Sequence, residues 1–151
     1  MAIVVPLTRI LVLVDGTEPS FHAADVAIGL ARSLAARLTV MAVVDTDTLH
    51  KLLSVRILVD SEMGEFEREL EASARRHLDH VRGRASARQV AIEEVLVTGL
   101  SEAVVPREAE SRGVGMIVLG GFHSSRVSRD LLARQRQQII DRAACPVLVV
   151  K

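Results

Sequence analysis

Short apolar runs alternate with longer amphipathic stretches along the whole chain. Most runs are continuous, all are four to eight residues long, and they are rich in branched side chains. Such runs are typical of strands that are buried on both faces of a parallel sheet. The five runs cover residues 10–14, 38–44, 90–97, 116–119 and 146–150.

The stretches between these runs repeat apolar residues at helical spacing. A first helix is predicted from the turn at Asp15 to Leu34, with Thr17 or Ser20 as its N-cap and Pro19 in its first turn. A second helix is predicted over residues 61–81, with Met63, Phe66, Leu70, Ala74, Leu78 and Val81 on one face, followed by a polar connection at 82–89.

The second half of the chain predicts two further helices. Ser101 is a candidate cap for one that ends at Gly113, and Pro106 inside it is expected to kink it or to delay its start. The other is predicted over residues 129–143. Residues 45–59 show only weak periodicity and are interpreted as a loop with a turn of helix.

The alternation of strands and helices predicts right-handed crossovers and a parallel sheet with helices on both faces. The fold class is therefore an open, doubly wound α/β fold. A chain of 151 residues with 49% hydrophobic residues can build one core, so we expect a single domain over residues 1–151.

Charge and aromatic content argue against several classes of partner. The chain carries 19 basic and 19 acidic residues, which predicts no general affinity for nucleic acid or an anionic membrane. Three Phe residues, with no Trp or Tyr, leave few platforms on which bases could stack. No apolar stretch reaches the ~20 residues of a membrane span, and no signal peptide is evident, so a cytoplasmic location is expected.

Several motifs at matching intervals resemble the universal stress protein family. They are RILVLVDGTEPS at 9–20, VVD at 43–45, the turn at Gly99, MIVLG at 116–120 and CPVLVV at 145–150. The resemblance covers nearly the whole chain. It implies a five-stranded sheet in the order 3-2-1-4-5, of the adenine nucleotide alpha hydrolase-like kind. It also implies a homodimeric, non-enzymatic stress-response protein that acts through protein contacts.

In that strand order the sheet reverses between the first and fourth strands, and ligands of open α/β sheets bind at such a switch point. Asp15 could accept hydrogen bonds there from a ribose or an adenine, or it could simply cap the turn before the first helix. The sequence leaves both interpretations open. The candidate residues at the switch point are Leu13, Val14, Asp15, Val43, Leu119 and Gly120.

The nucleotide-binding branch of the family carries G-x2-G-x9-G-[ST] after the fourth strand, where glycines let backbone N–H groups approach phosphate. Gly120 takes the first position here, but the other three fall on His123, Ala133 and Arg134. The sequence instead resembles the UspA-type branch, which lacks this motif. No cofactor is therefore expected, and weakly bound ATP or AMP is the alternative.

The same loop allows a rival interpretation. Ser124, Ser125 and Arg126 place hydroxyls and a guanidinium near a helix start, where such groups can hold phosphate without glycines. Serine and arginine are also common in solvated surface loops, and this second interpretation is favoured.

Other reactive residue types lack partners. His77 and His80 are spaced to share a metal, but no third ligand is evident, and a solvated helix face is favoured. Cys145, the only cysteine, lies near a helix C-terminus, where we expect a packed and inert thiol. No nucleophile is found with its base, so catalysis is not expected.

The last apolar run, at residues 146–150, is the predicted contact between two subunits. In the implied strand order it lies at the edge of the sheet, and uncovered apolar edges are avoided in soluble proteins. Pairing the same strand from two subunits across a two-fold axis would cover it. The predicted homodimer interface is Val147, Leu148, Val149 and Val150.

Overall fold

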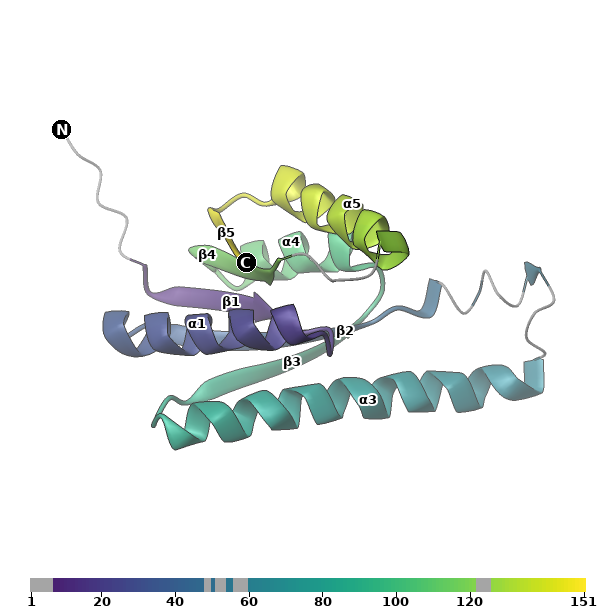
Figure 1. Ribbon diagram of the computed structural model, residues 1–151, viewed down its shortest axis with the longest axis horizontal. Coiled ribbons are helices and arrows are strands. Elements are labelled where there is room, and N and C mark those ends of the chain that lie inside the picture. The colour runs from purple at the N-terminus through teal and green to yellow at the C-terminus, as the bar shows by residue number, and fades with distance from the viewer. Residues whose placement is uncertain (1–6, 48–49, 51–53, 56–59, 122–125) are drawn as a thin grey trace.

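The computed structural model describes residues 7–47, 50, 54–55, 60–121 and 126–151, without the side chains of 60–61 and 126–132. Five parallel strands form one sheet in the order β3-β2-β1-β4-β5 (Figure 1), which confirms the predicted fold class. The strands are β1 Arg9–Leu13, β2 Arg37–Val44, β3 Ile92–Thr98, β4 Met116–Gly120 and β5 Val147–Val150, and the helices are α1 Glu18–Leu34, α3 Asp60–Ala87, α4 Ser101–Ser111 and α5 Arg126–Arg142.

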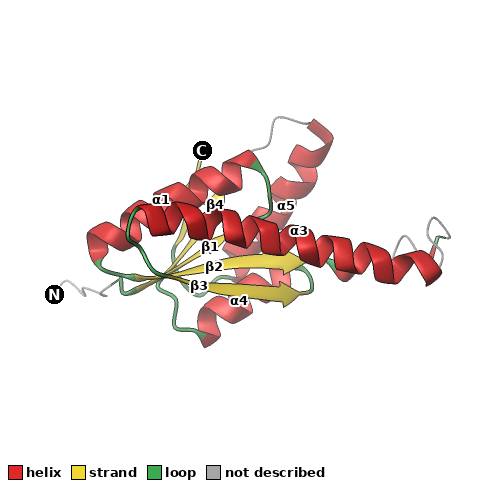
Figure 2. Ribbon diagram, turned by 90° about the horizontal axis from the view of Figure 1, so that it is seen from below, coloured by secondary structure: helices red, strands yellow, loops and turns green. Residues whose placement is uncertain are grey.

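Helices cover both faces of the sheet, and two core clusters fill the layers between them. Alternate residues of β1 enter different clusters, because successive side chains of a strand point to opposite faces. Ile10 and Val12 pack with α1 and α3, whereas Leu11 packs with α4 and α5. The same two helix pairs lie on opposite sides of the sheet in Figures 1 and 2. None of the described helices is long and apolar enough to cross a membrane.

Helix α1 begins as the sequence predicts. The Thr17 side chain accepts a hydrogen bond from the Ser20 N–H at 3.3 Å, which identifies Thr17 as the N-cap. Its small residues bring the helix axis close to the sheet, since Ala23, Ala24 and Ala27 are fully buried. The helix ends at Ala35, whose φ of 52° lies in the left-handed region, while the Ala35 N–H caps carbonyls of the last turn.

Replacing Ala35 by glycine should raise the free energy of unfolding by about 0.5–1 kcal/mol. A left-handed conformation costs an alanine roughly 1–2 kcal/mol, and part of this gain is offset by the greater entropy of glycine in the unfolded chain. Urea denaturation measures the change. Ala36→Gly, at a neighbour without a positive φ, is the control and should destabilise. A destabilised Ala35→Gly would contradict the left-handed cap.

Helix α3 is longer than predicted, because the polar stretch that follows Val81 continues the helix to Ala87. Arg82 donates to Glu94 of β3 at 2.8 and 2.6 Å, and Arg84 pairs with Asp25 of α1. These pairs join the last turns of α3 to two neighbouring elements. The predicted connection at 82–89 is therefore wrong for its first six residues, because tertiary contacts stabilise a segment with weak apolar periodicity.

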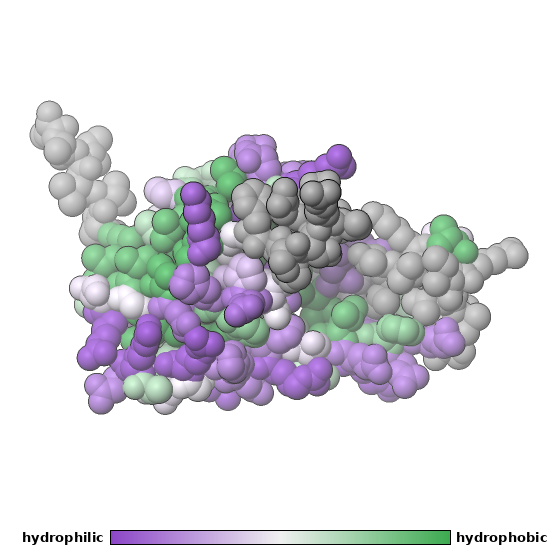
Figure 3. All heavy atoms as spheres, viewed as in Figure 1, coloured by the Kyte–Doolittle hydropathy of each residue, from purple (hydrophilic) through white to green (hydrophobic). Residues whose placement is uncertain are grey.

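The first half of α3 projects past the ends of β2 and β3 (Figures 1 and 2). Leu78 and Val81 are buried, but Phe66 and Leu70 of the same stripe remain 40% and 38% exposed. Hydrophilic side chains cover most of the outer surface of α3, at the bottom of Figure 3. The predicted apolar face therefore packs on the sheet only in its second half.

Helix α4 contains Pro106 in its interior, and the proline does not delay the start of the helix, which begins at Ser101. The N-cap is Leu100, which makes no side-chain cap bond, so the prediction of Ser101 as the cap is wrong. Pro106 has no N–H to donate to the carbonyl of Glu102, one turn earlier. Arg142 of α5 donates to that carbonyl at 3.2 Å instead, so a neighbouring helix satisfies the group that the proline leaves free.

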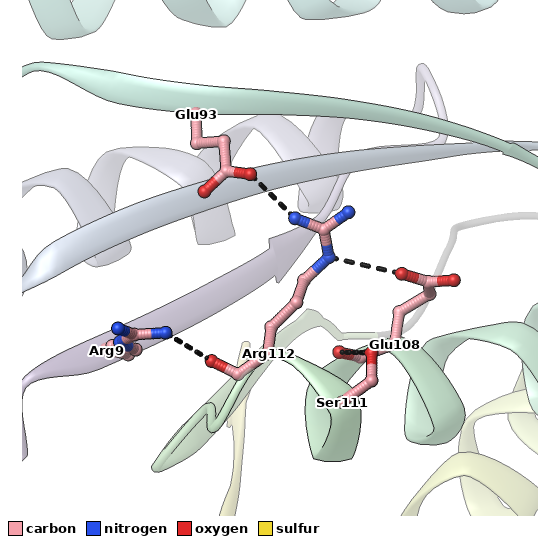
Figure 4. Close-up of polar contacts among 5 residues, drawn as sticks. All are labelled: Arg9, Glu93, Glu108, Ser111 and Arg112. Carbon is pink, nitrogen blue, oxygen red and sulfur yellow. Dashed lines mark hydrogen bonds and ion pairs between the residues drawn. The ribbon is translucent and has the colours of Figure 1, made fainter.

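Ion pairs tie the elements together at the amino ends of the strands (Figure 4). Arg9 of β1 donates to the Arg112 carbonyl at 2.7 Å, at the end of α4. The Arg112 guanidinium pairs with Glu93 of β3 at 2.6 Å and with Glu108 at 3.1 Å. This network lies at the edge opposite the carboxyl ends of the strands, where the candidate site is found.

Candidate functional site

Asp15 lines two of the hollows that lie beyond the carboxyl ends of the strands. The first, which we call the switch-point pocket, lies between β1 and β4 and has a volume of about 40 Å³. The second, the strand-end cavity, lies beyond β1 and β2 under α3 and has a volume of about 240 Å³. The pocket is lined by Leu13, Asp15, Thr17, Ser20, Leu119, Gly120, Gly121, Gln135, Arg136 and Ile139, and the cavity by Val14, Asp15, Ala42, Val43, Val44, Asp45, Leu70, Ser73, Ala74 and His77.

The turn after β1 positions Asp15. Gly16 has a φ of 84°, which allows the chain to reverse into α1. Oδ1 of Asp15 accepts from the Thr17 N–H at 3.0 Å and from the Thr17 hydroxyl at 2.5 Å. The Asp15 N–H donates to Ser20 Oγ at 3.3 Å. Asp15 therefore holds the turn, as one of the two interpretations expects, while its exposed carboxylate also borders both hollows.

Gly120 and Gly121 allow close contacts within the chain. A Cβ on Gly120 would lie 2.7 Å from the Pro19 carbonyl carbon and 2.8 Å from the Ser20 nitrogen, at the start of α1. A Cβ on Gly121 would lie 2.8 Å from the Val150 oxygen, at the end of β5. Backbone atoms of α1 and β5 therefore take the space beside these glycines, which gives both residues a role in packing.

Helix α5 covers the switch-point pocket with residues that the sequence did not single out. Gln135, Arg136 and Ile139 line the pocket, and Gln135 donates to Glu102 of α4 at 3.3 Å. Because α5 begins at Arg126, Ala133 and Arg134 lie inside the helix and do not line the pocket. His123, Ser124, Ser125 and the side chain of Arg126 lie outside the described residues.

His77 is the main addition that the structure makes to the site. Its ring lies against the turn after β1, within 2.4 Å of where a Cβ on Gly16 would be, so only glycine leaves room for it. The ring also meets Phe21 of α1 edge-on, with the centroids 5.9 Å apart. The prediction that His77 lies on a solvated helix face is therefore wrong. Its position seven residues after Leu70 and four before Val81 places it on the apolar stripe of α3, which is the signal that was missed.

Burial lowers the pKa of His77 below its ordinary value of 6.5. The nearby Asp15 carboxylate opposes this shift, whereas Arg76 and His80 add to it. The ring is therefore neutral at pH 7, with one nitrogen that donates and one that accepts. Such a ring can hydrogen-bond to a ligand without carrying a charge into the cavity.

The reactive groups of the described residues lie apart from one another or make long contacts. No group of three His, Cys, Asp or Glu residues among them is arranged to hold a metal. Ser73 Oγ lies 3.5 Å from His77 Nε2, which is a long contact. Cys145 is half-buried, and burial raises the pKa of its thiol, which disfavours the reactive thiolate.

Comparisons with known proteins agree with this architecture. The model of the Universal stress protein family matches residues 6–151. A universal stress protein of Bacillus subtilis is 26% identical over 148 residues, which cover 95% of this chain and 98% of the relative. The structure of UspA from Lactobacillus plantarum superposes with a TM-score of 0.79 at 22% identity, covering 97% of this chain and 99% of the other.

A third protein of the same fold was solved with a ligand. It is a universal stress protein family protein of Arabidopsis thaliana, and its structure has AMP bound. It matches 95% of this chain and 93% of its own, with a TM-score of 0.65 and 18% identity. At 18% identity this likeness shows a shared fold and nothing more.

Proposed function

The chain belongs to the universal stress protein family, and on that premise we propose that it is a non-enzymatic, single-domain stress-response protein that forms homodimers and lacks the family's ATP phosphate site. It would act through contacts with other proteins, as a member of the UspA-type branch. The proposal has three parts, which are the missing phosphate site, the absence of catalysis and self-association through β5.

The position of α5 carries the first part. A phosphate-binding turn needs backbone N–H groups that are free, and these occur in the first turn of a helix. Ala133 and Arg134 are the eighth and ninth residues of α5, where backbone N–H groups are already bonded within the helix. The close packing of Gly120 against α1 adds to this argument.

Titration of the protein with Mg-ATP should therefore give no saturable heat at sub-millimolar concentrations. The physical reason is that the two late motif positions present a methyl group and an interior helical backbone instead of free donors. Isothermal calorimetry makes the measurement. A dissociation constant for Mg-ATP at or below ~10 μM would contradict this part of the proposal.

The second part rests on the geometry around Ser73. A serine nucleophile needs a base that a third group orients. Among the described residues, His77 lies beside Ser73 at 3.5 Å, which is a long contact, and no hydrogen bond from the ring to a carboxylate is found. This arrangement favours ligand contact over bond cleavage.

The third part rests on the contrast between the two edges of the sheet. On β3, Glu93 and Glu94 are charged and held in ion pairs with Arg112 and Arg82, which discourages pairing with another strand. Strand β5 has four uncharged residues, Val147–Val150, each of them half-buried. The uncharged edge is therefore the better candidate for a two-fold contact.

The strand-end cavity favours a second candidate function, that of a sensor that binds an adenine nucleotide or nucleoside beside Asp15. A cavity with an apolar floor and a few polar groups is the usual form of a small-molecule site. The Arabidopsis relative with bound AMP makes this class of ligand a reasonable choice. Both candidates are compatible with self-association, and they differ in whether a ligand regulates the protein.

A further inference from the structure

The acidic residues of the chain are concentrated in the first half of α3. Residues 60–72 hold six acidic side chains and one basic side chain, Arg68, which gives this stretch a net charge of −5 in a chain whose overall net charge is zero. The stretch, which we call the acidic arm, belongs to the half of α3 that projects past the ends of β2 and β3 (Figure 2). It therefore stands out from the sheet as a negatively charged helix.

The stability of the helix does not explain these charges. Carboxylates in the first turn of a helix favour the positive end of its dipole, but this benefit ends within that turn. Glu65 and Glu69 lie beyond it, as do Glu67 and Glu71, and each pair is four residues apart, so the like charges repel. Arg75 offsets one of the four, since it pairs with Glu71 at 2.8 Å. The arm thus keeps charges that cost helix stability, which is typical of a functional surface.

An apolar stripe runs along the arm between its carboxylates. Phe66 and Leu70 lie one turn apart, and they are 40% and 38% exposed. At 3.6 residues per turn, Glu67 and Glu71 lie on one side of this stripe and Glu69 lies on the other. Adjacent exposed apolar side chains with a polar rim are typical of an interaction site.

A hollow at the base of the arm gives a partner room. It has a volume of about 480 Å³ and lies between α3 and the carboxyl ends of β2 and β3. The strands contribute the apolar side chains of Val44 and Leu96 to its wall, and the helix contributes the carboxylates of Glu67 and Glu71. The hollow therefore repeats, beside the stripe, the same combination of apolar and acidic groups.

We propose that the acidic arm binds a basic amphipathic helix of a partner protein. The apolar face of that helix would lie on Phe66 and Leu70. Its Lys or Arg side chains would reach the carboxylates on both flanks, as charges beside an apolar seam do in coiled coils. A nucleic acid or an anionic membrane would be repelled. This inference rests on the proposed function, because it assigns the protein contacts of that function a surface and a class of partner.

A second copy of the chain fits the arm less well. Among the side chains that the structure describes, the other exposed large apolar residues are Leu34 and Val55, and each stands singly. A second copy therefore presents no matching apolar stripe among those residues. Two arms placed side by side would also bring like charges together.

A synthetic peptide tests the proposal with the full chain. The probe is a helix of about 18 residues in which leucines recur at helical spacing, lysines fill the other positions and one tryptophan replaces a leucine. Because the chain has no Trp or Tyr, the tryptophan emission of the peptide reports binding without background. At low salt the wild type should bind the peptide with a dissociation constant of about 10 μM. In about 0.5 M salt the binding should be about fivefold weaker, because salt screens the charges.

Variants with matched controls locate the contact. Leu70→Ser should weaken peptide binding about tenfold, whereas Leu34→Ser, the same substitution at a residue of α1 that is 48% exposed, should bind as the wild type does. Glu67→Gln combined with Glu69→Gln should weaken binding about fivefold and remove most of its salt dependence. Glu110→Gln, at an exposed carboxylate of α4, should change neither. Thermal melts establish that each variant is folded under the conditions of the titration.

The outcomes separate this inference from the proposed function. A wild type that does not bind the peptide would overturn the inference and leave the dimer and the missing phosphate site standing, because light scattering and ATP titration test those separately. Unchanged binding in Leu70→Ser would overturn the surface, and equal binding of a peptide with the same composition in scrambled order would overturn the helix as the partner. Binding that appears only after residues 51–59 are replaced by a glycine–serine linker would assign the arm to that segment of the chain instead. A dimer that is lost in Leu70→Ser would assign the arm to a second copy.

Discussion

Gly120→Ala should lower the free energy of unfolding by roughly 3 kcal/mol. The new Cβ would lie 2.7–2.8 Å from three backbone atoms of Pro19 and Ser20, and the backbone cannot rotate away as a side chain can. Either β4 or the first turn of α1 must move, and both contribute buried residues to the core. Urea denaturation followed by circular dichroism gives the change in free energy.

Gly29→Ala is the matched control. Gly29 lies in the middle of α1, and nothing is within 4 Å of the position that its Cβ would take. This substitution should raise the free energy of unfolding by about 0.5–1 kcal/mol, because alanine favours the helix and restricts the unfolded chain. If Gly120→Ala proved as stable as the wild type, α1 would not pack on β4 as the structure has it. Gly120 would then be available to a ligand.

The strands and their order could be predicted from sequence because their signal is local and strong. A continuous apolar run such as residues 10–14 has few alternatives once it alternates with helices, and the family resemblance supplies the order. The glycine at 120 was interpreted as part of a phosphate motif. Its packing role depends on Pro19, which is about a hundred residues away in the chain, so no local pattern could reveal it.

The end of α3 and the start of α4 were mispredicted. Residues 82–87 have the composition of a connection, and their helical state depends on partners in α1 and β3. Ser101 has the side chain of a cap, yet it is the first residue of the helix, and Leu100 before it is the N-cap and makes no side-chain bond. At the end of α3, contacts that are distant in sequence outweigh local preference.

The candidate site was predicted in outline and missed in its detail. Leu13, Asp15, Leu119 and Gly120 do line the switch-point pocket, since the ends of adjacent parallel strands must meet at one edge. The contributions of α3 and α5 could not be placed, because which residues of a crossover helix reach the edge depends on where the helix begins and how far it extends. His77 and Arg136 enter the site for this reason.

Val149→Asp should convert the homodimer that we propose into a monomer. In the two-fold arrangement the β5 strands of two subunits pair along their free edges, so the substitution would bring two carboxylates close together in an apolar contact. Unpaired charges buried in this way cost several kcal/mol, which is enough to abolish a micromolar interface. Light scattering should give twice the chain mass of 16.4 kDa for the wild type and the chain mass itself for the variant.

Two controls separate loss of the contact from loss of the fold. Val149→Thr keeps the shape and strand preference of valine without a charge, and it should remain dimeric. Thr98→Asp places the same charge on an exposed position of β3, at the other edge of the sheet, and should leave the mass at twice the chain value. Val149 suits the experiment because it is half-buried and belongs to neither core cluster, so aspartate there disturbs the interior little.

A wild type that is monomeric at ~50 μM would defeat the proposal, since a micromolar interface would be largely formed at that concentration. A dimer that survives Val149→Asp would place the contact on another surface, and loss of the dimer in Thr98→Asp alone would place it on β3.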